Sequence, residues 1–67
     1  MEKFAKKLKE LRLERNLNRE TLAKEIGVSA SIIRYWEDGV KTPKIDAVIA
    51  LAKFFHISID ELVGLLD

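Results

Sequence analysis

Apolar side chains recur along this chain at spacings of three and four residues, which is the pattern of amphipathic helices. Phe4, Leu8 and Leu11 fall on one helical face. Their spacing predicts a first helix over about residues 2–15. Asn16 follows at the predicted end, and Asn tolerates the left-handed conformation that helix ends often adopt. No segment alternates apolar and polar residues over a useful length, so no strand is predicted.

Capping residues and glycines divide the next part of the chain into two short helices. Asn18 is a good N-cap for a helix over residues 19–26, which Gly27 terminates. The stretch SASIIRYWEDG is expected to begin a helix with Ser29 as N-cap and to end near Gly39. Only three residues separate the two predicted helices.

The remaining chain predicts two more helices. Pro43 favours the start of a fourth helix, and His56 is expected to end it. Ser58 and Glu61 form the S-x-x-E pattern of a capping box, which opens a fifth helix. The side chains expected to face inward from these two helices are Ile45, Val48, Leu51, Ala52, Phe55, Leu62, Val63 and Leu66. The prediction is therefore an all-α fold of five short helices, in a single domain over residues 1–67.

Composition narrows the possible functions. The 67 residues contain no cysteine and a single histidine, His56, which argues against a disulfide, a metal site or a thiol nucleophile. The sequence contains no phosphate-cradling glycine loop and no catalytic arrangement, so we expect neither an enzyme nor a cofactor. No small-molecule ligand is predicted.

The sequence carries no membrane signal, and its charge is uneven. No apolar run approaches the roughly 20 residues that span a bilayer, and the charged start MEKFAKKLKELR is unlike a signal peptide. Residues 1–44 hold eleven of the twelve Lys and Arg but seven of the eleven acids, a net charge of +4, whereas residues 45–67 carry −3. This distribution fits a polyanionic partner approached from one side, and equally an ordinary mixed surface.

Two helices joined by a three-residue turn that contains Gly describe a helix-turn-helix over about residues 18–38. The wider pattern, LNRETLAKEIGVSASIIRYWEDGVKTP followed by LAKFFHISIDELVGLL, resembles the phage Cro/repressor type of helix-turn-helix domain, often called Xre-like. The resemblance covers nearly the whole chain. It implies a lambda-repressor-like fold that binds double-stranded DNA with its third helix in the major groove. It also implies a transcriptional regulator, expected to be a repressor, in a prokaryotic or phage-type cytoplasm.

The resemblance also implies roles for individual residues. By family position, Ala30, Ser31 and Tyr35 are aimed into the groove, and Arg34 flanks them as the only long cation on the helix. Typical members place Gln, Arg, Lys or Thr at several of these positions, so direct reading of bases is expected to be sparse here. The residues expected to contact phosphates are Asn18, Arg19, Ser29, Lys41 and Lys44.

Other polar and aromatic residues are expected to be structural. Arg12 and Glu37 should form the partly buried ion pair found in the family, because a buried charge needs a partner. Trp36 shares the helical phase of Ile33 and is expected to pack in the core. Apolar residues are in surplus near the C-terminus, where family dimers form. The candidates for the interface of a homodimer on DNA are Phe54, Leu65 and Leu66.

An alternative interpretation stays open. Ala30 and Ile32 can only touch a thymine methyl, and Asp38 would repel a nearby phosphate. The alternative is a protein-interaction module, or a redesigned or engineered version of the fold, with weak or no specific DNA binding. A changed sequence preference in Arg34→Ala or Tyr35→Ala would distinguish base reading from purely electrostatic binding.

Overall fold

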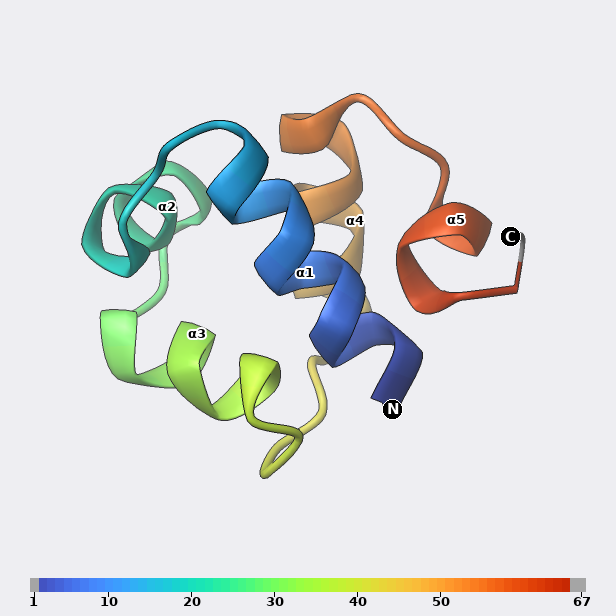
Figure 1. Cartoon of the computed structure of the whole chain (residues 1–67), viewed down its shortest axis with the longest axis horizontal. Helices are drawn as coiled ribbons and strands as arrows, with labels where there is room; N and C mark the ends of the chain where they lie inside the picture. The colour runs from blue at the N-terminus through green and yellow to red at the C-terminus, as the bar shows by residue number, and fades with distance from the viewer. Residues whose placement is uncertain (1, 66–67) are drawn as a thin grey trace.

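The computed structural model describes residues 2–65, and these form five helices and no strand. In chain order they are α1 (Glu2–Glu14), α2 (Arg19–Ile26), α3 (Ala30–Glu37), α4 (Ile45–Phe55) and α5 (Ile59–Val63) (Figure 1). The predicted all-α fold is confirmed, and the first helix ends one residue earlier than predicted. Within the described part, no helix is both long and apolar enough to cross a bilayer.

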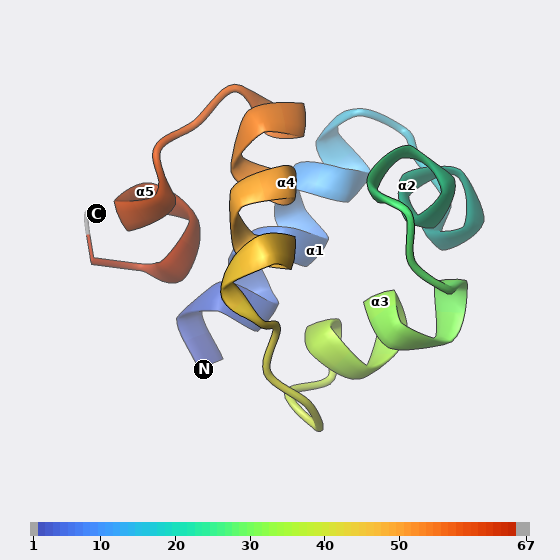
Figure 2. The same cartoon turned by 180° about the vertical axis from the view of Figure 1, so that it is seen from behind.

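The two longest helices, α1 and α4, lie in the middle of the molecule, as Figures 1 and 2 show from opposite sides. The α2–α3 pair lies on one side of them and α5 on the other. Helix α1 contacts both α3 and α5, and α4 contacts both α2 and α5. The α2–α3 pair is therefore supported by α1 at its α3 end and by α4 at its α2 end.

All five helices contribute to one hydrophobic core. Its fully buried large side chains are Phe4, Leu8, Leu22, Ile33, Leu51 and Leu62. Trp36 lies in the same core, as its helical phase predicts, and its ring meets that of Phe4 edge-on with centroids 6.4 Å apart. Because α3 places Ile33 and Trp36 in this core, its opposite side must face solvent.

Two helices end at non-glycine residues with left-handed backbone. Asn16 follows α1 with φ 56°, and His56 follows α4 with φ 57°. The N–H of His56 donates to the carbonyl of Lys53 at 3.3 Å, which closes the last turn of α4. Both ends agree with the sequence prediction. At His56 the conformation carries a steric cost, because a Cβ disfavours this region by roughly 1–2 kcal/mol.

One residue of α4 departs from the predicted inward face. The side chain of Ile45 is 62% exposed, whereas Val48, Leu51 and Phe55 are buried as predicted. Ile45 is the first residue of α4. Helical phase gives the direction of a side chain, but not how far the neighbouring helices extend beside it. In α5, Leu62 is buried and Val63 half-buried, and Leu66 lies outside the described residues.

Candidate nucleic-acid interface

Side-chain caps and a left-handed glycine fix the angle between α2 and α3. The Oδ1 atom of Asn18 accepts from the N–H of Thr21 at 2.7 Å, which caps α2. Gly27 ends α2 with φ 77°, a conformation that costs a glycine little. The Oγ atom of Ser29 then accepts from the N–H of Ile32 at 3.2 Å and caps α3. Three residues thus turn the chain from one capped helix into the next.

The two N-cap side chains keep a donor available after capping. Asn18 uses its carbonyl oxygen as the capping acceptor, so its NH₂ group can still donate. Ser29 uses an oxygen lone pair, so its O–H can still donate. Both side chains are exposed at helix N-termini, where N–H groups and the helix dipole favour an anion. These residues can therefore hold their helices and donate to a phosphate at the same time.

Helix α3 has one buried and one exposed side. Ile33, Trp36 and Glu37 are buried, whereas Ser31 and Arg34 are exposed. The predicted base-facing set shares this exposed side, with Tyr35 40% exposed and Ala30 half-buried next to α2. Arg34 is the longest of these side chains, and its Nε lies 3.8 Å from the Asp38 carboxylate in a pair that is largely exposed on both sides.

A polar recess of about 350 Å³ lies between the N-terminal ends of α2 and α3. It brings together five predicted DNA-contacting residues: Asn18, Arg19, Ala30, Ser31 and Arg34. Arg12 and Glu20 complete the lining, so three guanidinium groups face one carboxylate. Arg34 pairs with Asp38, and Arg12 and Arg19 pair with Glu37, so with Glu20 the charges around the recess balance. The recess is therefore polar, and it is bordered by the donors of two helix N-termini.

The carboxylate of Glu37 forms the buried support of this recess. Its Oε2 accepts from Arg12 Nε at 2.6 Å and its Oε1 accepts from Arg12 Nη2 at 3.0 Å. Arg12 also donates from Nη1 to the carbonyl of Leu17 at 2.9 Å. The predicted Arg12–Glu37 pair is therefore present, and it is more deeply buried than predicted, with side-chain exposures of 7% and 1%.

Arg19 joins the same carboxylate from α2. Its Nε and Nη2 lie 3.2 Å and 3.1 Å from Glu37 Oε1. Sequence reasoning assigned Arg19 to phosphate contact alone and missed this contact. One carboxylate near the end of α3 thus connects α1, α2 and α3. In residues 2–65, no buried side-chain nitrogen or oxygen lacks a hydrogen-bond partner.

Comparison with known families agrees with this geometry. The family model described as helix-turn-helix matches residues 8–62, which contain α2, α3 and most of the core. The chain belongs to the helix-turn-helix family. Its similarity to the Xre-like type, predicted from the sequence, is confirmed by the relatives and solved structures that follow.

Among curated relatives, the helix-turn-helix chain is 43% identical over 61 residues to the cryptic phage CTXphi transcriptional repressor RstR of Vibrio cholerae. It is 39% identical over 61 residues to the transcriptional activator BcrR of Enterococcus faecalis. Each match covers 91% of this chain, but only 55% of RstR and 30% of BcrR. Both relatives are named as transcriptional regulators, which supports the expectation that this domain is not an enzyme.

Two solved structures share the fold. A transcriptional regulator from Listeria innocua superposes with a TM-score of 0.89 at 38% identity, over 96% of this chain and 60% of that one. The P22 c2 repressor, in complex with a synthetic operator, superposes with a TM-score of 0.87 at 25% identity, over 94% and 96% of the two chains. These matches confirm the predicted lambda-repressor-like architecture of the helix-turn-helix domain.

The other predicted contacts lie apart from the polar recess. Lys41 and Lys44 line a different recess on the far side of α3. Tyr35 lines neither recess, and the Nζ of Lys41 lies 5.0 Å from the centroid of its ring. No packing partner for Tyr35 was predicted from the sequence. Lys41 lies six residues after Tyr35, in the loop that follows α3. This contact could not be predicted from helical spacing, because side chains that meet on a helix are three or four residues apart.

The candidate dimer residues differ in the exposure and the contacts of their side chains. Leu65 is 74% exposed, and Leu66 lies outside the described residues. Phe54 is half-buried, with the Arg15 guanidinium 5.5 Å from its ring centroid. Arg15 also donates to the carbonyls of Phe54 and Phe55 at 3.2 and 3.1 Å. This contact, which the sequence did not indicate, covers part of the Phe54 ring.

Proposed function

We propose that this chain binds double-stranded DNA as a transcriptional regulator, with α3 in the major groove. The two-sided character of α3 carries the proposal, because a core-anchored helix presents Ser31, Arg34 and Tyr35 to solvent beside a polar recess. The major groove of B-DNA is about 12 Å wide and accepts one α-helix. The family and the P22 c2 repressor–operator complex support the same role.

We assign base reading to the exposed side of α3. Arg34 would make the principal specific contact, because its guanidinium can bond two acceptors of guanine. Ser31 and Tyr35 would add hydroxyl contacts, and Ala30 would touch a thymine methyl. Arg34 must leave Asp38 to do so, but an exposed pair of this kind is weak, at about 0–1 kcal/mol, and yields to a phosphate or base.

We assign phosphate contacts to two groups of residues. Asn18, Arg19 and Ser29 lie at the N-termini of α2 and α3, where the free donors described above point to solvent. Lys41 lies in the loop between α3 and α4, and Lys44 is the N-cap residue of α4. Both side chains are exposed. Arg19 keeps only part of its hydrogen-bonding capacity for a phosphate, because Nε and Nη2 contact Glu37.

We propose repression as the regulatory outcome and a homodimer as the DNA-bound form. RstR, the relative at 43% identity, is named a repressor, whereas BcrR is named an activator. Repression, as opposed to activation, is therefore a separate proposal. The exposed Leu65, together with Ile49, supports a dimer. A cytoplasmic location is consistent with this role. Sedimentation at high micromolar concentration, with and without DNA, tests the dimer; a monomer in both conditions would contradict it.

Selection from a random double-stranded DNA library tests the DNA-binding proposal. The affinity of the chain for the most enriched sequence is then measured at about 50 and 200 mM salt. We expect an enriched, roughly palindromic site. Arg34→Ala should then cost about 1–3 kcal/mol of binding free energy and relax preference at one position. Arg19→Gln should weaken binding to all sequences equally and reduce the salt slope by about 1.

Matched controls make this test decisive. Lys53→Gln removes an exposed cation from α4, far along the chain from α3, and should leave DNA affinity and preference unchanged. Circular dichroism of Arg19→Gln must show an intact fold, because Arg19 also contacts Glu37. No enriched sequence, with binding that disappears at the higher salt, would contradict specific recognition and favour a protein-interaction module.

A further inference from the structure

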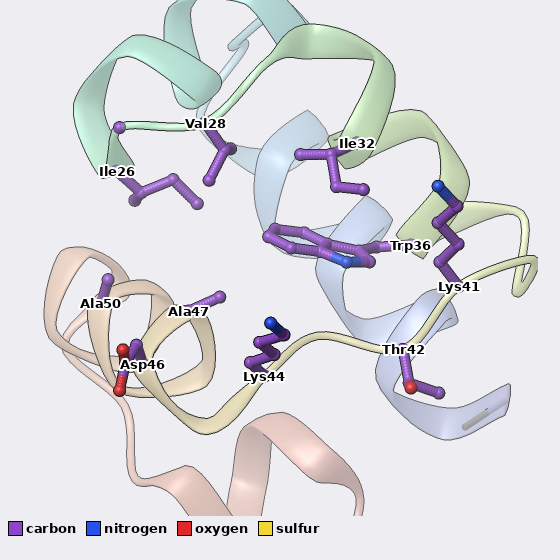
Figure 3. Close-up of a pocket in the computed structure, with 11 residues that line it drawn as sticks. Ile26, Val28, Ile32, Trp36, Lys41, Thr42, Lys44, Asp46, Ala47 and Ala50 are labelled. Carbon is purple, nitrogen blue, oxygen red and sulfur yellow. The ribbon is translucent and has the colours of Figure 1, made fainter.

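A second recess lies between the α2–α3 pair and the start of α4, on the side of α3 away from the polar recess (Figure 3). Its volume is about 510 Å³, within the range of roughly 300–1,000 Å³ that is typical of small-molecule pockets. Figure 3 shows Ile26, Val28 and Ile32 on one wall, Ala47 on the other, and the Trp36 ring between them. The interior of this recess is therefore mainly apolar.

The charged side chains of this recess are unequal in sign. Lys41, Lys44 and Asp46 are the ionisable residues of the lining, two cations and one acid, and the Nζ of Lys41 lies beside the Tyr35 ring. The Nζ of Lys44 points into the space between Trp36 and Ala47 (Figure 3). Among the described residues, Lys44 takes part in no ion pair. Asp46 lies at the opposite end from Lys41, beside Ala47 (Figure 3).

We infer that this recess binds a small amphipathic carboxylate. The hydrocarbon part would lie against Trp36, Ile32 and Val28, where removing apolar surface from water is favourable. The carboxylate would bond the Nζ of Lys44 in a charge-assisted hydrogen bond. A cationic amphiphile would meet the same apolar wall but place its charge beside Lys44, so the recess selects for anions.

The ligand site adjoins the proposed DNA-binding surface. Val28 lies in the turn between α2 and α3, Ile32 lies on α3, and Lys41 and Lys44 are proposed phosphate contacts. A carboxylate bound at Lys44 would remove its positive charge from the surface offered to DNA. This regulatory step rests on the proposed function, whereas binding of the carboxylate itself does not. We expect the ligand to lower DNA affinity and to reduce the salt slope by about 1.

Trp36 supplies the readout, because it is the only tryptophan of the chain and its ring lines the recess. The test titrates the full chain with decanoate, decanol and decyltrimethylammonium, which differ in head-group charge, and follows Trp36 fluorescence below the concentration at which each probe self-associates. We expect saturable binding of decanoate, at least tenfold tighter than that of the cation. Ala47→Met, which fills the recess, should weaken decanoate and decanol alike.

Lys44→Gln tests the assigned anion contact. This exposed substitution should weaken decanoate at least fivefold and leave decanol unchanged, and the matched Lys53→Gln should change neither. Equal affinity for all three probes, or no saturation, would overturn the assignment. An apparent decanoate affinity that falls as the protein concentration rises would also overturn it, because a second copy of the chain or another protein surface would then be the natural occupant.

DNA binding is measured separately in the presence of decanoate. Saturable decanoate binding with unchanged DNA affinity would overturn the regulatory step and leave the ligand site standing. Absence of DNA binding in every condition would contradict the proposed function, while the fluorescence titration would still decide the ligand site. A fall in DNA affinity that Lys44→Gln abolishes would support both the site and its regulatory effect.

Discussion

Replacing Glu37 with glutamine tests whether a single buried carboxylate holds α1, α2 and α3 together. The side chain of Glu37 is 1% exposed, and Arg12, its principal partner, is 7% exposed. Glutamine has nearly the same shape but removes the charge and replaces one acceptor oxygen by an NH₂ donor. That donor would face the guanidinium donors of Arg12 and Arg19, and Arg12 would remain charged in a largely dry environment.

The expected cost of Glu37→Gln is large for a domain of this size. Removing one partner of a buried ion pair typically costs 3–5 kcal/mol, and we expect about 3 kcal/mol because one acceptor oxygen remains. A chain of 67 residues has a total unfolding free energy of about 3–10 kcal/mol. The midpoint of thermal unfolding should therefore fall by about 12–24 °C.

Urea unfolding followed by circular dichroism measures this cost. Asp38→Asn is the control, because its 3.8 Å pair with Arg34 is exposed on both sides and should contribute less than about 0.5 kcal/mol. The double variant Arg12→Met, Glu37→Leu should be at least about 1 kcal/mol more stable than Glu37→Gln, because the deeply buried charge of Arg12 is removed and Arg19, whose side chain is 34% exposed, can be solvated by water. A cost below about 1 kcal/mol for Glu37→Gln would refute the reasoning.

Two further predictions concern the ends of helices. His56→Gly should raise the unfolding free energy by about 1 kcal/mol. Glycine removes the steric cost of the left-handed φ of 57°, and this gain exceeds the extra chain entropy that glycine loses on folding. An unchanged or lower urea midpoint would contradict this prediction. Arg15→Gln should lower the unfolding free energy by about 1 kcal/mol, because the carbonyls of Phe54 and Phe55 lose their two hydrogen bonds. In the same urea experiment, Lys24→Gln on the exposed side of α2 should have no effect, and equal values for the two variants would argue against the Arg15 contact.

The sequence predicted features that depend on a few neighbouring residues. The caps at Asn18 and Ser29, the left-handed end at Asn16 and the burial of Trp36 follow from residue type and spacing within one helix, and the structure contains each of them. The exposure of Ile45 was not predictable, because it depends on where other helices end. Helical phase is local information, whereas the extent of packing is set by the whole fold.

The missed features of the site are contacts between separate elements. The Arg19 contact with Glu37 depends on the angle between α2 and α3 and not on either helix alone. The Lys41 contact with Tyr35 and the apolar recess depend on the path of the chain from α3 to α4. One signal was available for the recess: Ile32 is an apolar residue at the edge of the buried face of α3, and the structure places it half-buried against the core.

The arrangement of α3 separates stability from recognition. Ile33, Trp36 and Glu37 fix its orientation from the buried side, so the exposed Ser31 and Arg34 contribute little to folding. Exposed substitutions away from caps and buried contacts usually change stability by less than about 0.5 kcal/mol. The residues proposed to read bases can therefore change without loss of the fold, while their directions stay set by the core. Even a small number of proposed base contacts would start from a fixed geometry, because the Glu37 carboxylate ties α3 to both α1 and α2.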